Sequence, residues 1–188
     1  MVENIEIEFK FNLENPEELI ERLNSVASSE HQDLYQKDTY FVPVHRDFLG
    51  VDPVSEWLRL RHTEKGCSVN YKNWYFDEEG KNSSYCDEFE TGVEDIGILL
   101  KIFKKLDISE VIVVEKIRNT WMYKNVEIAV DKVTELGHYI ELEYKGDGMD
   151  IEENKTHLHR VLEELGAKTG PQNFLGYPMI LLKKRGEG

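Results

Sequence analysis

Hydrophobic and polar residues alternate along much of the chain, which is the pattern of a half-buried β-strand. In the stretch IEIEFKF at residues 5–11, the isoleucines and phenylalanines fall on one face, and Glu6, Glu8 and Lys10 fall on the other. Similar alternation, or a run of β-forming residues, recurs downstream. We therefore expect about eight strands, at residues 2–13, 31–43, 56–63, 67–76, 85–93, 110–123, 126–133 and 139–145.

Segments with helical spacing lie between or after these strands. Asn15 is a suitable N-cap, and Pro16 suits the first position of a helix. In a later segment, Ile98, Ile102 and Leu106 recur at helical spacing. We expect helices at residues 15–26, 94–106 and 150–165, and a short helix or capping segment at 174–185.

These elements predict an α+β fold that is mainly β. Antiparallel strands with local connections can close into a barrel, which removes exposed strand edges. The sequence shows no repeat and no obvious interdomain linker. We therefore expect a closed eight-stranded antiparallel β-barrel with helices packed outside, in a single domain over residues 1–188.

The composition argues against several classes of partner. The chain has 37 acidic residues against 23 Lys and Arg, a formal net charge of −14, which disfavours nucleic acid and anionic membranes. No apolar run approaches the roughly 20 residues needed to span a bilayer, and the N-terminus has no leader pattern. The two cysteines, Cys67 and Cys86, are expected to be free thiols. We expect a cytoplasmic protein.

Charged residues recur two apart on the polar faces of the expected strands. One interpretation is an ordinary solvated face. However, most of these strands carry one sign of charge, and like charges so placed repel each other, so we favour a face that binds a compensating ligand. The basic members are Lys10, Arg59, Arg61, Lys72, Lys116 and Arg118, and the acidic members are Glu6, Glu8, Glu88, Glu90, Asp131, Glu141 and Glu143.

The chemistry of these side chains indicates the ligand. Arginine binds two phosphate oxygens at once with its planar guanidinium group. Clustered carboxylates bind hard divalent cations such as Mg²⁺ or Mn²⁺, which also bridge phosphate oxygens. If the charged faces point into the barrel, the interior is a hydrated tunnel suited to a triphosphate with divalent cations.

The same residues resemble a known family. EIEFK at residues 6–10 fits the E-x-E-x-K signature of the CYTH family, the triphosphate tunnel metalloenzymes. The resemblance extends over nearly the whole chain, through LRLR (58–61), YKNW (71–74), EFE (88–90), EKIR (115–118) and DKVTELGHYIELE (131–143). The family includes class IV adenylyl cyclases, thiamine triphosphatases and inorganic triphosphatases, and its fold is an eight-stranded antiparallel tunnel.

The resemblance implies a role for each charged residue. The six basic residues would bind phosphate, and Lys10 and Lys72 are also expected to be catalytic. Glu6, Glu8, Asp131, Glu141 and Glu143 would include the metal ligands, and Glu88 and Glu90 would contact metal or order the basic residues. The resemblance thus implies a Mg²⁺- or Mn²⁺-dependent enzyme whose small-molecule substrate is ATP, tripolyphosphate or thiamine triphosphate.

Several alternatives stay open. The layout is closest to the cyclase-like members, although Asn73 and Trp74 stand where many of those have Gly-Pro. The alternatives are a triphosphatase and a non-catalytic module that binds polyphosphate or nucleotide. The chain is expected to be a monomer or a homodimer, and Tyr177 is a candidate to close the tunnel. His157 and His159, two apart on a helix, are expected to be surface residues.

Overall fold

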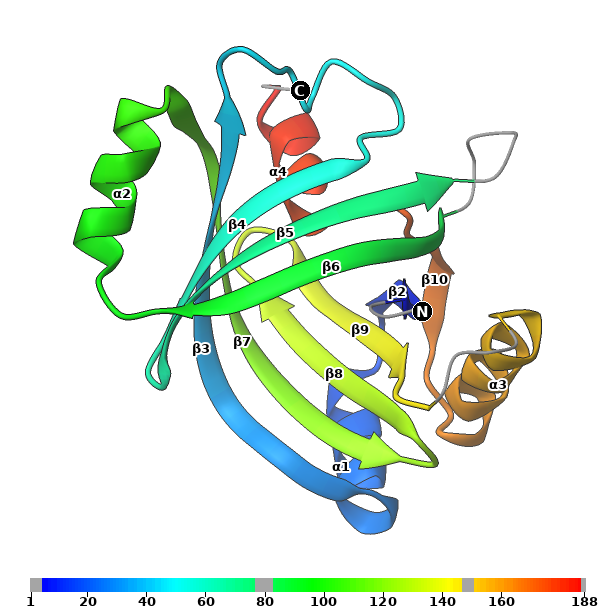
Figure 1. The fold of residues 1–188 in the computed structure, drawn as a ribbon. Helices are drawn as coiled ribbons and strands as arrows, with labels where there is room; N and C mark the ends of the chain where they lie inside the picture. Colours follow the sequence, from blue (N-terminus) through cyan, green and yellow to red (C-terminus); the bar gives the residue numbers. More distant parts are fainter. Residues whose placement is uncertain (1–4, 77–82, 147–150, 187–188) are drawn as a thin grey trace. The chain divides into compact units, whose positions relative to one another are not determined.

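The computed structural model describes residues 5–76, 83–146 and 151–186. Within these ranges it contains ten strands and four helices (Figure 1). In chain order they are β1 (Ile5–Glu6), β2 (Glu8–Leu13), α1 (Pro16–Val26), β3 (Ser28–Pro43), β4 (Glu56–Thr63), β5 (Gly66–Phe76), β6 (Ser83–Val93), α2 (Ile96–Lys105), β7 (Ile108–Tyr123), β8 (Val126–Val133), β9 (Gly137–Tyr144), α3 (Ile151–Glu164), β10 (Thr169–Gln172) and α4 (Tyr177–Arg185).

The fold is mostly antiparallel β, as predicted, and the expected elements are present in the described ranges, although the strand expected at residues 2–13 is divided into β1 and β2. Residues 2–4 of that expected strand and residue 150 of the helix expected at 150–165 lie outside the described residues. The bounds of β4 and β8 are those expected from the alternation, whereas β3 and β7 are longer than expected, at 16 residues each. β10 was not expected, because its sequence, TGPQ, has no alternation and contains both Gly and Pro.

The prediction of a closed eight-stranded barrel is wrong. The strand order of the sheet is β1-β6-β5-β4-β3-β7-β8-β9-β2-β10, so the sheet begins at β1, ends at β10 and is not closed. β2 pairs with β9 on one side and with β10 on the other, so it has no free edge with which to close a barrel. The unexpected strand β10 therefore takes the edge that closure would need.

The chain divides into two compact units. Among the described residues, the first unit comprises Tyr35–Glu115 and residues 175–186, and the second comprises Ile5–Leu34 and Lys116–Phe174. The long strands β3 and β7 contribute residues to both units.

The second unit has the larger core. One face of β2, β8 and β9 supplies alternate apolar residues, and α1 and α3 cover this face with Leu19, Leu23, Leu158 and Val161. Ile128, Ile140 and Leu142 in this core are fully buried. Because strand side chains alternate, the charged residues of the same strands lie on the opposite face of the sheet.

The first unit has a smaller core beneath α2. Phe103 of α2 packs edge-on against Phe41 of β3, with ring centroids 5.1 Å apart, and Leu60 of β4 completes the cluster. Asp95 caps the helix by accepting a hydrogen bond from the backbone N–H of Ile98, 2.9 Å away.

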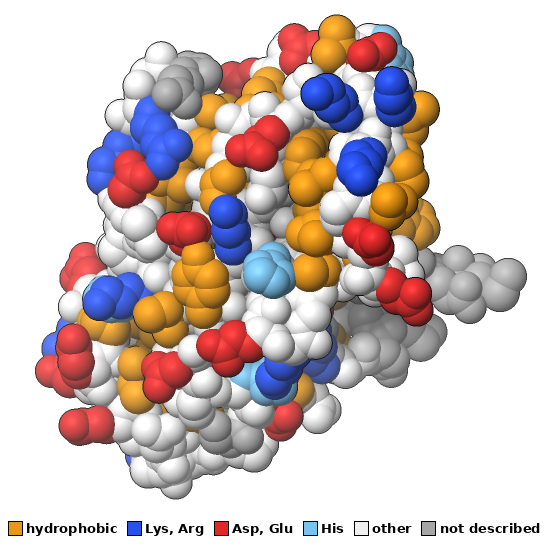
Figure 2. All heavy atoms as spheres, turned by 90° about the vertical axis from the view of Figure 1, so that its left-hand side faces the viewer, with side chains coloured by type: hydrophobic (Ala, Val, Ile, Leu, Met, Phe, Trp, Pro, Cys, Tyr) orange, Lys and Arg blue, Asp and Glu red, His pale blue; other side chains and the backbone are white. Residues whose placement is uncertain are grey.

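The apolar residues by which helix α2 was first recognised do not face the core. Ile98, Ile102 and the capping residue Leu106 are 49%, 47% and 57% exposed, and the buried stripe contains Ile96, Leu99 and Phe103 instead. Figure 2 views the side of the molecule on which α2 lies in Figure 1, and hydrophobic side chains gather there beside Lys and Arg side chains.

Both cysteines are free, as predicted, and lie on neighbouring strands. None of the helices in the described ranges has the length and apolar character required to cross a membrane.

Candidate active site

Two clusters of charged side chains, one of them with an asparagine, lie on the charged faces of the strands, one in each unit. We call them the Asp131 cluster (Glu8, Lys10, Lys116, Arg118, Asp131, Glu141 and Glu143) in the second unit and the Asp38 cluster (Asp38, Arg59, Arg61, Asn70, Lys72, Glu88 and Glu90) in the first. Of the residues expected from the sequence, only Glu6 has a side chain outside the described part of the structure.

Asp131 is the buried centre of the second unit's cluster. Its carboxylate is 0% exposed and accepts a hydrogen bond from Lys116 Nζ at 2.8 Å. Arg118, directly opposite on β7, donates to both carboxylate oxygens, from Nε at 2.7 Å and from its terminal nitrogen at 2.5 Å. Burial by itself would raise the pKa of Asp131, but the attraction of Arg118 and Lys116 outweighs burial, and the pKa lies below its usual value.

Glu141 joins two basic residues in the same cluster. Its carboxylate lies 3.0 Å from Lys10 Nζ, directly across the β2–β9 ladder, and also accepts a hydrogen bond from Arg118. Burial opposes ionisation, yet Arg118 and Lys10 together hold the pKa of Glu141 well below its usual value. Glu141 is therefore a carboxylate at neutral pH in spite of its burial.

A row of carboxylates lies beside these pairs. Glu143 stands directly opposite Glu8 on β2 and Glu127 on β8, so the three side chains point to the same side of the sheet. Lys145 lies 2.6 Å from Glu143, and Lys10 lies 3.9 Å from Glu8. Sequence reasoning missed Glu127, which belongs to the charged face because it lies four residues before Asp131 on β8.

The first unit's cluster is organised around Asp38, which sequence reasoning also missed. Asp38 is 1% exposed, and Arg61 donates two hydrogen bonds to it, each 2.7 Å long. Arg59 lies 3.9 Å from the same carboxylate. The signal for Asp38 was its place in β3 between Gln36 and Tyr40, a single charge between two uncharged residues on the same alternation.

Arg59 is the least satisfied cation of this cluster. Its Nε is buried and, within the described residues, has no hydrogen-bond partner; Gln36 Oε1 is in the same state. Burial disfavours the charge of Arg59, but Asp38 outweighs burial and raises the pKa of the guanidinium. The side chain is 12% exposed and is thus a permanent, largely buried cation whose Nε donor is unused.

Lys72 and the acids of β6 complete the Asp38 cluster. Lys72 stands directly opposite Glu88, with 3.6 Å between Nζ and the carboxylate, and lies 5.5 Å from the centre of the Trp74 ring. Asn70 donates to Glu88, and Ser68 donates to Glu90.

The acids of the two clusters have the right chemistry for a divalent cation but are not gathered around one point. Among the residues that the structure describes, no three Asp, Glu, His or Cys side chains form a group that could hold a metal ion. Asp131, Glu141 and Glu143 are each bound to a basic side chain instead. The donor set of carboxylate oxygens is the type that Mg²⁺ and Mn²⁺ prefer, so a cation would have to draw side chains away from these partners.

Comparisons with known proteins identify the family of the chain. Residues 4–171 match the CYTH domain family. The chain is 32% identical over 163 residues to MJ0240 of Methanocaldococcus jannaschii, whose name assigns it provisionally to the adenylate cyclases, and the match covers 87% of this chain and 89% of that protein.

Solved structures share the fold. The PH1819 protein of Pyrococcus horikoshii has a TM-score of 0.79 at 28% identity, over 96% of this chain and 99% of that one. A protein of Hippeastrum, HpAC1, described as having a dominant triphosphatase activity, has a TM-score of 0.63 at 16% identity, over 97% and 96% of the two chains.

Proposed function

The chain belongs to the CYTH domain family, and from this premise we propose that it is an enzyme that acts on a triphosphate with the help of a divalent cation. Within this class we propose chemistry of the class IV adenylyl cyclase kind, which converts ATP to cyclic AMP and pyrophosphate. The name of the M. jannaschii relative supports this choice. A cytoplasmic location and a monomeric or homodimeric state stay predictions from the sequence.

One observation carries the proposal: the buried Arg59 with its unused donor. A buried N–H without a partner costs about 1–3 kcal/mol, and more when the group is charged, so a chain retains one where a ligand completes it. Arg59 has a raised pKa and cannot become neutral to relieve the burial. A phosphate oxygen is an acceptor with the matching charge and geometry.

We assign roles to the residues of both clusters on this basis. Arg59, Arg61, Lys116 and Arg118 bind phosphate oxygens, and Lys10 and Lys72 bind phosphate close to the reacting phosphorus. Glu8, Asp131, Glu141 and Glu143, with Glu6, would hold Mg²⁺ or Mn²⁺, and Glu88 and Glu90 contact metal or orient Lys72. When bound, the cation neutralises charge on the phosphate oxygens.

The protein's part in the reaction is to position the substrate and neutralise its charge. In the cyclase reaction, the 3′-hydroxyl of ATP attacks the α-phosphorus and pyrophosphate leaves. In a triphosphatase reaction, water attacks the terminal phosphorus of tripolyphosphate or an organic triphosphate. We keep the second reaction as an alternative because the fold is shared with HpAC1, which is described as a triphosphatase.

A product assay separates the possibilities. The full chain is incubated with ATP, tripolyphosphate or thiamine triphosphate, each in Mg²⁺ and in Mn²⁺. Cyclic AMP and pyrophosphate from ATP would support the cyclase reaction, and orthophosphate from any substrate would support the triphosphatase. Binding without any product would contradict the enzymatic proposal and favour a non-catalytic module.

A pair of variants links the activity to the buried cation. Arg59→Gln should lower kcat/KM by about 10²-fold, on the scale of one preorganised charge contact. Arg22→Gln, on the exposed face of α1, removes the same charge away from both clusters and should leave kcat/KM unchanged. Equal activity of the two variants would contradict the assignment of Arg59.

A further inference from the structure

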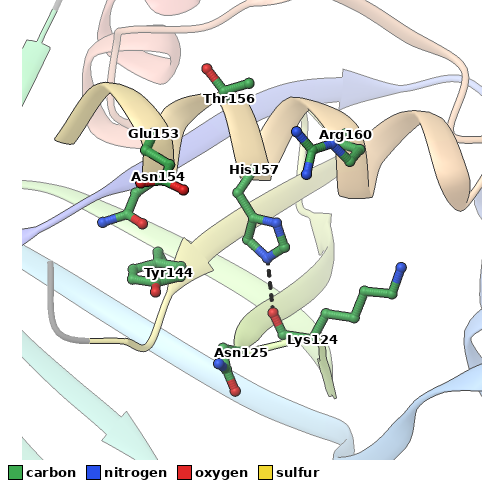
Figure 3. A pocket seen from close by; sticks show the side chains of 8 residues that line it. All are labelled: Lys124, Asn125, Tyr144, Glu153, Asn154, Thr156, His157 and Arg160. Carbon is green, nitrogen blue, oxygen red and sulfur yellow. Dashed lines mark hydrogen bonds between the residues drawn. The ribbon is translucent and has the colours of Figure 1, made fainter. Parts of the chain in front are cut away.

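A second candidate site is a pocket in the second unit, between α3 and the turn that joins β7 to β8 (Figure 3). Its volume is about 540 Å³, which lies within the usual range for small-molecule sites. Tyr144 of β9 lines it, and this residue points away from the face that carries Glu141 and Glu143, because side chains alternate along a strand. No member of the Asp131 cluster or the Asp38 cluster lines the pocket.

The pocket wall contains a buried amide that is not satisfied. Asn154 of α3 is 7% exposed, and its Nδ2 has no hydrogen-bond partner in the part of the chain that the structure describes. The residue lies on the same helix face as Leu158 and Val161, which are fully buried in the core. An apolar residue would satisfy packing at this position, so the amide points to a ligand with a hydrogen-bond acceptor.

The other end of the pocket is cationic. Arg160 lies further along α3 and is exposed, and its charge also acts on Glu164 of the same helix. Lys124 also lines the pocket, but its Nζ binds Glu164 at 2.6 Å. Because Lys124 is paired with Glu164, the guanidinium of Arg160 is the group placed to receive an anion.

The walls between these two ends are held in place. His157 Nε2 is hydrogen-bonded to the carbonyl oxygen of Lys124 at 2.9 Å (Figure 3), and the rings of His157 and Tyr144 meet edge to face at 6.0 Å. Lys124 and Asn125 form the two-residue turn with φ of 50° and 60°, as in a type I′ hairpin. A preformed pocket loses less entropy when it binds a ligand.

We propose that this pocket binds a small organic anion that presents a hydrogen-bond acceptor to Asn154 Nδ2 and its anionic group to Arg160. A nucleoside monophosphate has both groups and is small enough for the pocket. The site is separate from the triphosphate chemistry proposed above, because different side chains form it.

The test is a nuclear magnetic resonance titration of the full chain with AMP, and with adenosine and inorganic phosphate as the two halves of the probe. AMP should shift the backbone amides around Lys124, Tyr144 and Asn154 and should bind more tightly than either half. Asn154→Leu and Arg160→Gln should each weaken binding at the pocket by about tenfold, the effect of losing one hydrogen bond or charge contact. Arg22→Gln, a matched loss of charge on α1, should have no effect.

Three results would overturn the proposal. The first is the absence of shifts at the pocket amides with all three probes. The second is unchanged affinity at the pocket in both Asn154→Leu and Arg160→Gln. The third is AMP binding that shifts only the residues of the two clusters, which would support the proposed function and not this pocket. Glu141→Gln, in the Asp131 cluster, should leave the shifts at the pocket amides unchanged. The pocket proposal and the proposed triphosphate function can therefore be refuted independently of each other.

Discussion

Lys10 and Ile7 test which face of the N-terminal strands does chemistry and which face supports the fold. Lys10 lies 3.0 Å from Glu141, whereas Ile7 is 3% exposed in the core of the second unit. Lys10→Ala should lower kcat/KM by about 10²-fold and should cost less stability than Ile7→Ala, because Glu141 keeps Arg118 as a partner. Ile7→Ala should cost about 2–5 kcal/mol of unfolding free energy with little direct effect on chemistry.

Steady-state kinetics and urea unfolding of the two variants would check this contrast. A kinetically silent Lys10→Ala would mean that the polar face is only solvated.

Asp131 should matter more for stability than any other acid in its cluster. Asp131→Asn leaves Lys116, which is 3% exposed, and Arg118 without their full counter-charge. Breaking a buried ion pair from one side costs about 3–5 kcal/mol. Glu143→Gln is the control, because Glu143 binds Lys145 near the surface and such a pair contributes about 0–1 kcal/mol. Equal urea midpoints for the two variants would refute the central role of Asp131.

The lowered pKa values of Asp131 and Glu141 predict a loss of stability in acid. Both carboxylates ionise more readily in the folded chain than in the unfolded chain, so the unfolded chain binds more protons as the pH falls. Their contribution is complete above the usual carboxyl pKa of about 4 and is lost as the pH falls through the lower folded values. Unfolding free energies measured from pH 6 to pH 2 should fall less steeply in Glu141→Gln.

Residue identity on the charged faces could be predicted from the sequence, but the ion pairs could not. Glu141 and Glu143 could be recognised because they are two like charges, two residues apart, on one strand. Asp38 and Glu127 were not recognised, because neither has a like-charged neighbour two residues away. The contact of Lys10 with Glu141 depends on the register of β2 against β9, and alternation within one strand does not define that register.

At the level of elements, the sequence predicted helix α2 but not which of its faces is buried. Two apolar stripes run along this helix, and its sequence gives no reason to choose between them. Phe103→Ala should cost about 3–5 kcal/mol, since the ring packs on Phe41 and Leu60. Ile98→Glu, on the exposed stripe, should change stability by less than about 0.5 kcal/mol.

Chemical unfolding would check the α2 pair. If Ile98→Glu were as destabilising as Phe103→Ala, the exposed stripe would be buried in solution.

The first and last residues of a strand could be predicted from the sequence where one face of the strand is apolar. Five Val, Ile and Ala residues of strand β8 are buried, and its limits were predicted correctly. The strand β10 has no such pattern and is held mainly by pairing with β2. Such a strand is specified by its partner and not by its own side chains.

At the scale of the whole molecule, the sequence indicated a mainly antiparallel β fold and the family, but not the course of the sheet. Eight alternating segments are compatible with a closed barrel. Closure depends on which strand occupies each edge, and β10 occupies the outer edge of β2. The division into two compact units was not predicted either, because β3 and β7 each run through both units without a linker.

The ion pairs of the second unit have a thermodynamic consequence for two ligands. Glu141 already binds Lys10 and Arg118. A triphosphate that takes these bases releases the carboxylate, and a divalent cation that takes the carboxylate releases the bases. Each ligand therefore removes a competitor of the other, and the two should bind with positive and reciprocal cooperativity.

Calorimetric titrations of tripolyphosphate and Mg²⁺, corrected for their complex in free solution, would measure this coupling. The affinity of each ligand should rise by the same factor in the presence of the other, and Lys10→Ala should reduce that factor. Independent binding would show that Glu141 keeps its basic partners throughout. With positive coupling, in contrast, the salt bridges of Glu141 in the ligand-free chain would make the protein respond to the two charged ligands together more strongly than to either one alone.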